Sequence, residues 1–441
     1  MRTVITYGTY DLLHRGHVRL LERAKALGDY LIVGVTSDTY DQERGKLNVV
    51  QSTLERVDAV RATGIADKVI VEEYEGQKID DIRKYGVDVF TVGSDWRGFF
   101  DYLGKYCEVV YLERTRGVSS TELRAKAHPP VRGGIIGMDR ISERFYDEHM
   151  FVSGIDMECV LPVEGGRPQG WAKGCPIDVC ASEDELMDAV DAVFVFEPAD
   201  RHFATIMNAL EHGCHVFCDS PAFISKAEAE EALSLASERG LFVFDGLKTL
   251  HFPAFEHLLV MATDVHVGKI VDIEAACSQI PRGWDPQEAR PVDGAFYDWG
   301  PTALMPAVKL GGTVHGDVSF QVRREGAGVD AFTRMTASFG DVSVSVKVGK
   351  GVKTEGDLVV TGTKGYIYVP APWWLCDYFE IRHEDPRDTR KVFFQYKGEG
   401  MRYEILEFVR AVNAGRTEDD AYGRDEILCE AELMEAFGRL G

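Results

Sequence analysis

The sequence predicts an α/β protein with a Rossmann-like N-terminal domain, a second Rossmann-type domain, and an α/β domain with an open mixed or antiparallel sheet. Strand-like apolar runs alternate with amphipathic helical patterns in both halves, which is typical of parallel α/β layers. Adjacent prolines at 129–130 end the first series, and a glycine-rich strand at 133–137 begins the second. From about residue 265, alternating stretches such as 342–346 indicate an antiparallel sheet. We therefore expect domains at 1–128, 129–250 and 251–441.

The individual elements follow from the same periodicities. In the first series we expect strands at 2–7, 30–36, 68–72, 87–93 and 107–112. The helices expected between them are 15–27, 52–63, 78–85, 97–105 and 119–127. In the second series we expect strands at 191–196, 214–218 and 241–245, and helices at 183–190, 201–212 and 225–239. Two helices, at 401–414 and 424–439, are expected to close the chain.

Composition narrows the class of protein. The 441 residues are 45% hydrophobic and 27% charged, as in globular proteins. There is no apolar run of about 18 residues, so we expect neither a signal peptide nor membrane insertion. Nine cysteines, an odd number without paired spacing, favour a reduced, cytoplasmic compartment. The net charge of −23 argues against nucleic acid as a partner.

The most informative segment directly follows the first predicted strand. It reads Gly8-Thr9-Tyr10-Asp11-Leu12-Leu13-His14-Arg15-Gly16-His17. On a helix, the i, i+3 spacing of the two histidines brings both rings to one face. The free N–H groups of the first helical turn lie beside them and form a site for an anion such as a polyphosphate. The alternative is a pair of surface histidines after an ordinary β-α turn.

Two further segments of the first domain are also suited to phosphate. Lys46 lies in a loop after the second strand, where a flexible lysine can contact a phosphate as a point charge. Arg114 precedes a helix whose start is indicated by the capping-box spacing of Ser119 and Glu122. The hydroxyls at 119–121 and the free N–H groups then form a second anion site. In isolation, Lys46 reads as a solvated cation and Ser119 as a helix cap.

Residues 8–25, 93–96 and 114–122 resemble the glycerol-3-phosphate cytidylyltransferase family of nucleotidyltransferases, and the resemblance spans 1–127. It implies transfer of CMP from CTP to a small polyol phosphate, such as glycerol 3-phosphate, with Mg²⁺ accompanying CTP. It also implies catalytic roles for His14, His17, Lys46 and Arg114. The nucleotide-binding positions implied are Gly8, Thr9, Tyr10, Asp11, Gly16, Arg56, Asp67, Tyr74, Gly93, Asp95, Ser119, Ser120 and Thr121. Among these, Tyr74 falls where the family uses an aromatic near the base. The chain departs from the family pattern at Gly64, where an arginine is usual.

Residues 132–441 resemble the glucose–fructose oxidoreductase and inositol dehydrogenase family, on stretches such as 134–137, 191–195 and 209–217. The resemblance implies a Rossmann domain followed by an open-sheet domain. Its chemical positions are altered, however. Asp139 replaces a glycine of the dinucleotide fingerprint, Ser220 replaces the lysine expected before Pro221, and Thr302 replaces a histidine. The candidate C-terminal site comprises Gly137, Asp139, Arg140, Ser220, Pro221, Lys248, Asp298 and Thr302.

Three hypotheses follow. In the first, the chain is a cytidylyltransferase that serves cell-surface polymer synthesis, and its oxidoreductase-like half is degenerate and non-catalytic. In the second, the chain is bifunctional: an NAD(P)-dependent C-terminal half reduces a keto-sugar phosphate, and the N-terminal half activates the resulting polyol phosphate. In the third, it is a nucleotide sensor or scaffold without turnover. Both families commonly self-associate, so we expect a homodimer or a larger homo-oligomer.

Overall fold

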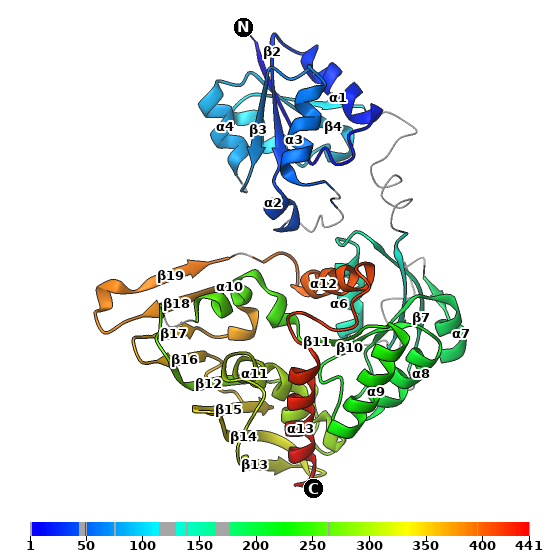
Figure 1. Ribbon diagram of the computed structural model, residues 1–441, viewed down its shortest axis with the longest axis vertical. Coiled ribbons are helices and arrows are strands. Elements are labelled where there is room, and N and C mark those ends of the chain that lie inside the picture. Colours follow the sequence, from blue (N-terminus) through cyan, green and yellow to red (C-terminus); the bar gives the residue numbers. More distant parts are fainter. Residues whose placement is uncertain are drawn as a thin grey trace. The chain divides into compact units, whose positions relative to one another are not determined.

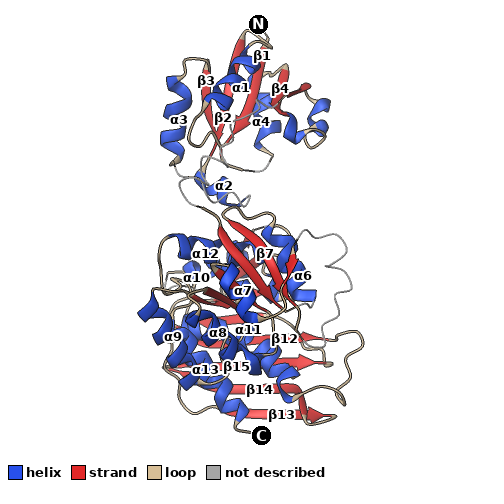
Figure 2. Ribbon diagram, turned by 90° about the vertical axis from the view of Figure 1, so that its right-hand side faces the viewer, coloured by secondary structure: helices blue, strands red, loops and turns tan. Residues whose placement is uncertain are grey.

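The computed structural model describes residues 2–43, 49, 51–74, 76–113, 129–137, 140–163, 177–262, 265–394 and 396–440. Several predicted features lie outside these ranges: Lys46, Arg114, Ser119, Ser120, Thr121, Asp139, the side chain of Asp95 and the helix expected at 119–127. The chain divides into two compact units, built mainly from residues 1–130 and 131–441. Figures 1 and 2 show the elements of each unit. Among the described helices, none is long and apolar enough to cross a membrane.

The N-terminal unit is a five-stranded parallel sheet in the order β3-β2-β1-β4-β5. Its strands are β1 (Thr3–Gly8), β2 (Tyr30–Thr36), β3 (Lys68–Glu72), β4 (Val89–Gly93) and β5 (Glu108–Leu112). Its described α-helices are α1 (Arg15–Lys25), α2 (Asp38–Glu43), α3 (Thr53–Ala62) and α4 (Gln77–Tyr85), joined by the 3₁₀ turns η1 (Ser94–Trp96) and η2 (Asp101–Lys105). Because neighbouring residues of a strand face opposite ways, Val4 packs in one apolar core with α1 and α3, and Ile5 packs in a second core with α4.

The C-terminal unit begins with a six-stranded parallel sheet in the order β11-β10-β9-β6-β7-β8. Its strands are β6 (Val131–Ile136), β7 (Ile155–Leu161), β8 (Asp178–Val179), β9 (Ala192–Val195), β10 (His215–Asp219) and β11 (Val243–Gly246). Its helices are α6 (Arg140–His149), α7 (Glu183–Ala189), α8 (Ala199–Glu211) and α9 (Lys226–Arg239). Helices α8 and α9 pack side by side, as Figure 1 shows.

A mixed eight-stranded sheet follows, in the order β13-β14-β15-β12-β16-β17-β18-β19, with β12 and β15 parallel. Its strands are β12 (Ile270–Gln279), β13 (Ser319–Glu325), β14 (Val329–Phe339), β15 (Val342–Lys350), β16 (Leu358–Gly362), β17 (Tyr366–Val369), β18 (Tyr378–Arg382) and β19 (Arg390–Phe393). The helical segments of this part are η4 (Lys248–His251), α10 (Pro253–Met261), η5 (Pro291–Asp293), α11 (Ala295–Gly311), η6 (Trp373–Leu375), η7 (Pro386–Asp388), α12 (Met401–Asn413) and α13 (Arg424–Gly438). Helix α11 packs on β12, β14 and β15 and against α13.

The predicted fold class is confirmed, with two parallel Rossmann-like sheets and a mixed eight-stranded sheet. Nearly all predicted elements fall within a few residues of the observed ones. The helix expected at 97–105 is wrong, because this segment forms only short 3₁₀ turns. Gly98 has a φ of +88°, a left-handed conformation that an α-helix cannot contain.

Candidate functional site

The predicted N-terminal site residues Gly8 and Gly93 end neighbouring parallel strands. Strand β1 pairs with β2 on one side and with β4 on the other, so the strand order reverses beside β1. In open α/β sheets, ligands bind outside the carboxyl ends of the strands at such a switch point. A side chain at Gly93 would meet no atom of the described residues within 4 Å, whereas one at Gly8 would lie 3.0 Å from the Tyr10 ring. The topology therefore indicates the ends of β1 and β4 as the edge where a ligand binds.

The two motif histidines meet at the start of α1. His14 is the N-cap of this helix, and its Nδ1 accepts a hydrogen bond from the Gly16 amide at 3.0 Å. An imidazole that accepts through Nδ1 carries its proton on Nε2 when neutral, so His14 presents Nε2–H as a donor. The rings of His14 and His17 stack with centroids 3.9 Å apart and planes inclined by 17°. The structure thus brings both rings to the amino end of a helix, where an anion is favoured.

The loop that carries His14 is held in a strained conformation. Tyr10 and Leu12 have φ angles of +55° and +47°, which L-residues with side chains rarely adopt. Gln51 clamps this loop from the start of α3. Its Oε1 accepts from the Leu12 amide at 2.8 Å, and its own amide donates to Asp11 Oδ1 at 3.0 Å. The side chains of Tyr10 and Asp11 are both buried. Gln51 carries no chemical signal of its own in the sequence, so its role here could not be predicted from it.

Arg56 ties the same loop to the second strand. Its guanidinium is fully buried and donates to three backbone carbonyls, those of Gln51, Thr9 and Thr36, at 2.7–2.9 Å. It also pairs with the carboxylates of Asp38 and Asp41. The Thr9 hydroxyl in turn donates to Asp41 Oδ1 at 2.9 Å. This geometry supports a positioning role for Arg56, which was predicted to bind nucleotide directly.

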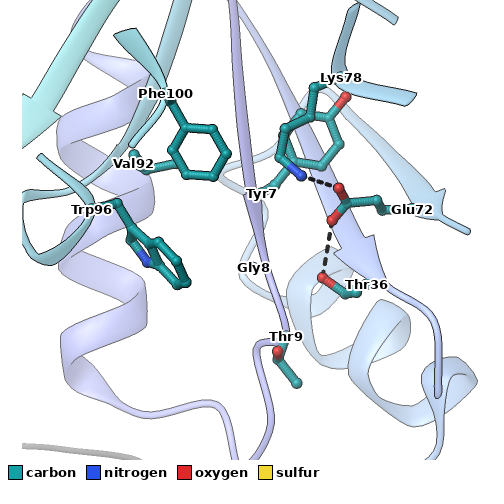
Figure 3. Close-up of a pocket in the computed structure, with 9 residues that line it drawn as sticks. All are labelled: Tyr7, Gly8, Thr9, Thr36, Glu72, Lys78, Val92, Trp96 and Phe100. Atoms are coloured by element: carbon teal, nitrogen blue, oxygen red, sulfur yellow. Dashed lines mark hydrogen bonds and ion pairs between the residues drawn. The ribbon is translucent and has the colours of Figure 1, made fainter. Parts of the chain in front are cut away.

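A pocket of about 40 Å³ opens beside Gly8 at the same edge of the sheet. Its wall includes the aromatic rings of Tyr7, Trp96 and Phe100. Figure 3 shows Lys78 and Glu72 pointing toward each other in this pocket, where they form a buried ion pair. The Lys78 ammonium also lies 4.8 Å from the centroid of the Tyr7 ring. Glu72 accepts a second hydrogen bond, from the Thr36 hydroxyl at 3.1 Å. The pocket therefore holds a fixed ammonium group that the sequence analysis did not select.

Two other predicted nucleotide-binding residues lie in different places. Tyr74 follows β3 at the carboxyl edge, is 48% exposed, and donates its hydroxyl to Asp80 at 2.9 Å. Asp67 precedes β3 at the opposite, amino edge, where it accepts from the Leu31 amide at 2.6 Å and pairs with Lys25. These contacts hold the pKa of the Asp67 carboxyl below its ordinary value. The expectation that Asp67 contacts the nucleotide does not fit this position, because Asp67 anchors the start of β2. Gly64, where the chain departs from the family's usual arginine, lies just after α3 and three residues before Asp67.

In the C-terminal unit, Gly137 directly follows β6, which pairs with β9 where the strand order of the second sheet reverses. Its φ is +117°, and a Cβ there would lie 2.2 Å from the Phe196 carbonyl oxygen. Only glycine fits this turn, and the exposed Arg140 begins α6 after it. Ser220 and Pro221 follow β10 with a cis peptide bond. Lys248 begins η4 just after β11, so it lies at the same edge of the sheet.

The remaining C-terminal candidates lie on α11. Asp298 and Thr302 are four residues apart, which places both on one face of the helix. Asp298 Oδ2 accepts from Gln279 Nε2 at 2.9 Å and lies 3.2 Å from the Lys350 ammonium. The structure thus pairs Asp298 with a lysine that the sequence analysis did not select.

Comparison with known proteins identifies the N-terminal unit. Residues 5–126 match the family model described as cytidylyltransferase-like. The glycerol-3-phosphate cytidylyltransferase of Bacillus spizizenii is 48% identical over 124 residues, which are 28% of this chain and 95% of that protein. The chain belongs to the cytidylyltransferase family. Its cytidylyltransferase domain is similar to glycerol-3-phosphate cytidylyltransferase, as the motif at 8–17 predicted.

The C-terminal unit matches a different family. Residues 131–247 match the model of an oxidoreductase family with an NAD-binding Rossmann fold. The scyllo-inositol 2-dehydrogenase (NADP(+)) of Bacillus subtilis is 24% identical over 318 residues, 69% of this chain and 95% of that protein. The structure of KijD10, a 3-ketoreductase from Actinomadura kijaniata, matches with a TM-score of 0.60 and 20% identity, covering 70% of this chain and 96% of that chain. The C-terminal unit is a Gfo/Idh/MocA oxidoreductase domain, and this membership suggests NAD(P) binding.

Proposed function

We propose that the cytidylyltransferase domain transfers CMP from CTP to glycerol 3-phosphate, giving CDP-glycerol and pyrophosphate for the synthesis of a cell-surface polymer. The stacked pair of His14 and His17 at the start of α1 carries this proposal. The similarity to a glycerol-3-phosphate cytidylyltransferase along nearly that protein's whole length supports it.

The reaction needs fixed hydrogen-bond donors more than a base. The attacking phosphate oxygen of the acceptor is already anionic, so no strong proton acceptor is required. The barrier comes from the approach of like charges and from negative charge that builds on the α-phosphoryl group and the departing pyrophosphate. His14 presents Nε2–H, and the first turn of α1 presents backbone N–H groups. Donors fixed in this way stabilise the transition state without reorganising.

The pocket beside Gly8 supports a location for the acceptor. The Lys78 ammonium is fixed by Glu72 and by aromatic neighbours, and it lies at the same edge as the histidines. We assign it to the acceptor phosphate, because a phosphate oxygen accepts a charge-assisted hydrogen bond from an ammonium group. We further assign Mg²⁺ to the triphosphate of CTP, which supplies the oxygen ligands that this cation prefers.

A crossed screen tests the proposal. Each of CTP, UTP, ATP and GTP is mixed with glycerol 3-phosphate, glycerol 2-phosphate or ribitol 5-phosphate, with and without Mg²⁺, and pyrophosphate release is measured. We expect the highest kcat/KM for CTP with glycerol 3-phosphate, and no release after Mg²⁺ is chelated. Preference for another nucleotide or another acceptor would contradict the assignment. Release that needs no acceptor would contradict a transfer reaction altogether.

A further inference from the structure

Lys350 and Asp298 form an ion pair in the oxidoreductase domain. This pair could not be predicted from the positions at which the sequence departs from the family pattern. Lys350 ends β15, and its ammonium lies 3.2 Å from Asp298 Oδ2 and 2.8 Å from the Asp293 carbonyl oxygen. The Lys350 side chain is 14% exposed and that of Asp298 is 33% exposed. Among the described residues these two are its recorded polar partners, so one ammonium N–H remains for a ligand. The pair is therefore fixed in place and still accessible.

Two contacts place this pair close to the carboxyl edge of the six-stranded sheet. Arg290, which pairs with Asp293 at 2.7 Å, also lies 3.7 Å from Asp200 in the first turn of α8. That helix follows β9, so the segment before α11 reaches the end of β9. On the other side, the Thr249 hydroxyl after β11 donates to the Trp374 carbonyl at 2.8 Å. Ligands of such sheets bind at this edge.

Two packed tryptophans lie near this edge of the sheet, since the Trp374 carbonyl accepts a hydrogen bond from Thr249. Trp299, the neighbour of Asp298 on α11, packs against Trp374 with ring centroids 4.9 Å apart. The buried indole N–H of Trp299 has no acceptor among the described residues. A buried donor without an acceptor is costly, and a hydroxyl or phosphate oxygen of a ligand would satisfy it. The Lys353 ammonium lies 5.6 Å from the Trp374 ring centroid. These residues offer flat apolar surface, a spare indole donor and a second ammonium group near the same edge.

The backbone at Gly137 fits the pyrophosphate of a dinucleotide, while Asp139, outside the described residues, departs from the glycine of that fingerprint. The backbone there has no room for a side chain and leads into the amino end of α6. A nicotinamide cofactor held at this edge supplies or accepts a hydride. The usual proton donors are absent, because position 220 is a serine and position 302 a threonine, and neither hydroxyl titrates near neutrality.

We propose that the oxidoreductase domain is an active reductase of a phosphorylated hydroxyketone, and that Lys350, oriented by Asp298, is its proton donor. The carbonyl carbon gains a hydride from NAD(P)H. As the C=O π bond breaks, its electron pair takes a proton from the Lys350 ammonium to form the new O–H bond. Lys350 is left as a neutral amine and regains a proton from water. The products are an oxidised cofactor and a polyol phosphate.

The charges favour a phosphorylated substrate. The protein carries a net charge of −23, yet Lys350 and Lys353 flank the same turn after β15. Among the described residues, Lys353 pairs with no carboxylate, so its ammonium can attract an anion. The product of this reduction belongs to the class of acceptor that the proposed cytidyl transfer consumes, so this link rests on the proposed function.

The test uses the full chain with NADH or NADPH and with dihydroxyacetone phosphate or ribulose 5-phosphate, followed by cofactor absorbance. We expect turnover in the wild type and a loss of about 10²–10⁴-fold in Lys350→Gln. Lys347→Gln is the matched control, because this residue lies on the other face of β15 and pairs with Glu355. In Lys350→His, the falling limb of the pH–rate profile should move toward about 6.5, the ordinary pKa of imidazole. A merely structural lysine would not shift that limb.

Binding is measured separately and without cofactor. Tryptophan emission is followed in a Trp96→Phe background while dihydroxyacetone phosphate is added. We expect a change that disappears in Trp374→Phe, and an affinity at least tenfold weaker when Lys350 and Lys353 are both glutamine. Absence of cofactor oxidation with both ketones, or equal rates in wild type and Lys350→Gln, would overturn the inference. Pyrophosphate release from the same preparations distinguishes this failure from failure of the cytidyl transfer.

Discussion

The clamp formed by Gln51 gives a sharp test of how the histidine loop is held. Replacing Gln51 by alanine removes the acceptor of the Leu12 amide but keeps the backbone bond to Asp11, since that bond uses the amide of residue 51. A partly buried N–H left without an acceptor costs about 1–3 kcal/mol. Because Tyr10 and Leu12 are already strained, we take about 1–2 kcal/mol as the shift against the competent loop.

That shift corresponds to a factor of about 5–30 in population. We therefore expect kcat/KM for CTP with glycerol 3-phosphate to fall by about 5–30-fold in Gln51→Ala, measured by pyrophosphate release, with an unchanged circular dichroism spectrum. Gln51→Glu keeps an oxygen acceptor and should restore most of the activity. Leu54→Ala, at an exposed position in the first turn of α3, is the matched control. Wild-type kcat/KM in Gln51→Ala would refute the argument that this clamp holds the loop.

Three further predictions concern single side chains. Lys78→Gln should raise the KM for glycerol 3-phosphate by about 10–100-fold and leave the KM for CTP nearly unchanged, because a charge-assisted hydrogen bond contributes about 1.5–3 kcal/mol. Lys84→Gln, on the same helix, is the control. A selective loss of CTP affinity in Lys78→Gln would contradict the assignment. Arg56→Ala leaves the buried Asp41 carboxylate without its ion-pair partner. Hydrogen exchange should therefore show about 3–5 kcal/mol less protection in β1 and β2 than in the wild type, while β9 and β10 stay unchanged. An equal loss of protection in both units, or no loss in either, would disprove this. Burial raises the pKa of Asp330 to about 6 from 3.8, so the folded state binds a proton more tightly than the unfolded state, and stability falls as pH rises between these values. Asp330→Asn should remove about 3 kcal/mol of that fall, measured by urea unfolding at pH 4 and pH 7. An unchanged pH dependence of stability would contradict this.

Much of the fold could be predicted because its signals are local. The apolar run at 4–7 followed by Gly8 and the histidine motif specifies a strand, a turn and a helix within a short stretch of sequence. The glycine-rich strand before Gly137 does the same in the second unit. The prediction of a helix at 97–105 is wrong because it relied on the spacing of the apolar residues. The left-handed backbone of Gly98 does not fit within an α-helix.

The parts of the site that could not be predicted depend on contacts between distant elements. Lys78 reads as one more charged residue of an amphipathic helix, and it becomes a buried ammonium only because Glu72 on β3 and Tyr7 on β1 meet it there. Lys350 lies at the end of an alternating strand, and its pairing with Asp298 requires β15 to pack on α11. Asp67 shows the converse. It matches a functional position of the family in sequence, yet it lies at the amino edge of the sheet, opposite the edge where the histidines lie.

The account depends most directly on the two stacked histidines at the start of α1. Pyrophosphate release from CTP and glycerol 3-phosphate is compared between wild type, His14→Ala and His17→Ala, with CTP affinity measured in parallel. Loss of one fixed donor to the transition state predicts a fall in kcat of about 10²–10³-fold in each variant, while both stay folded. Turnover close to that of the wild type in either variant would contradict the central claim.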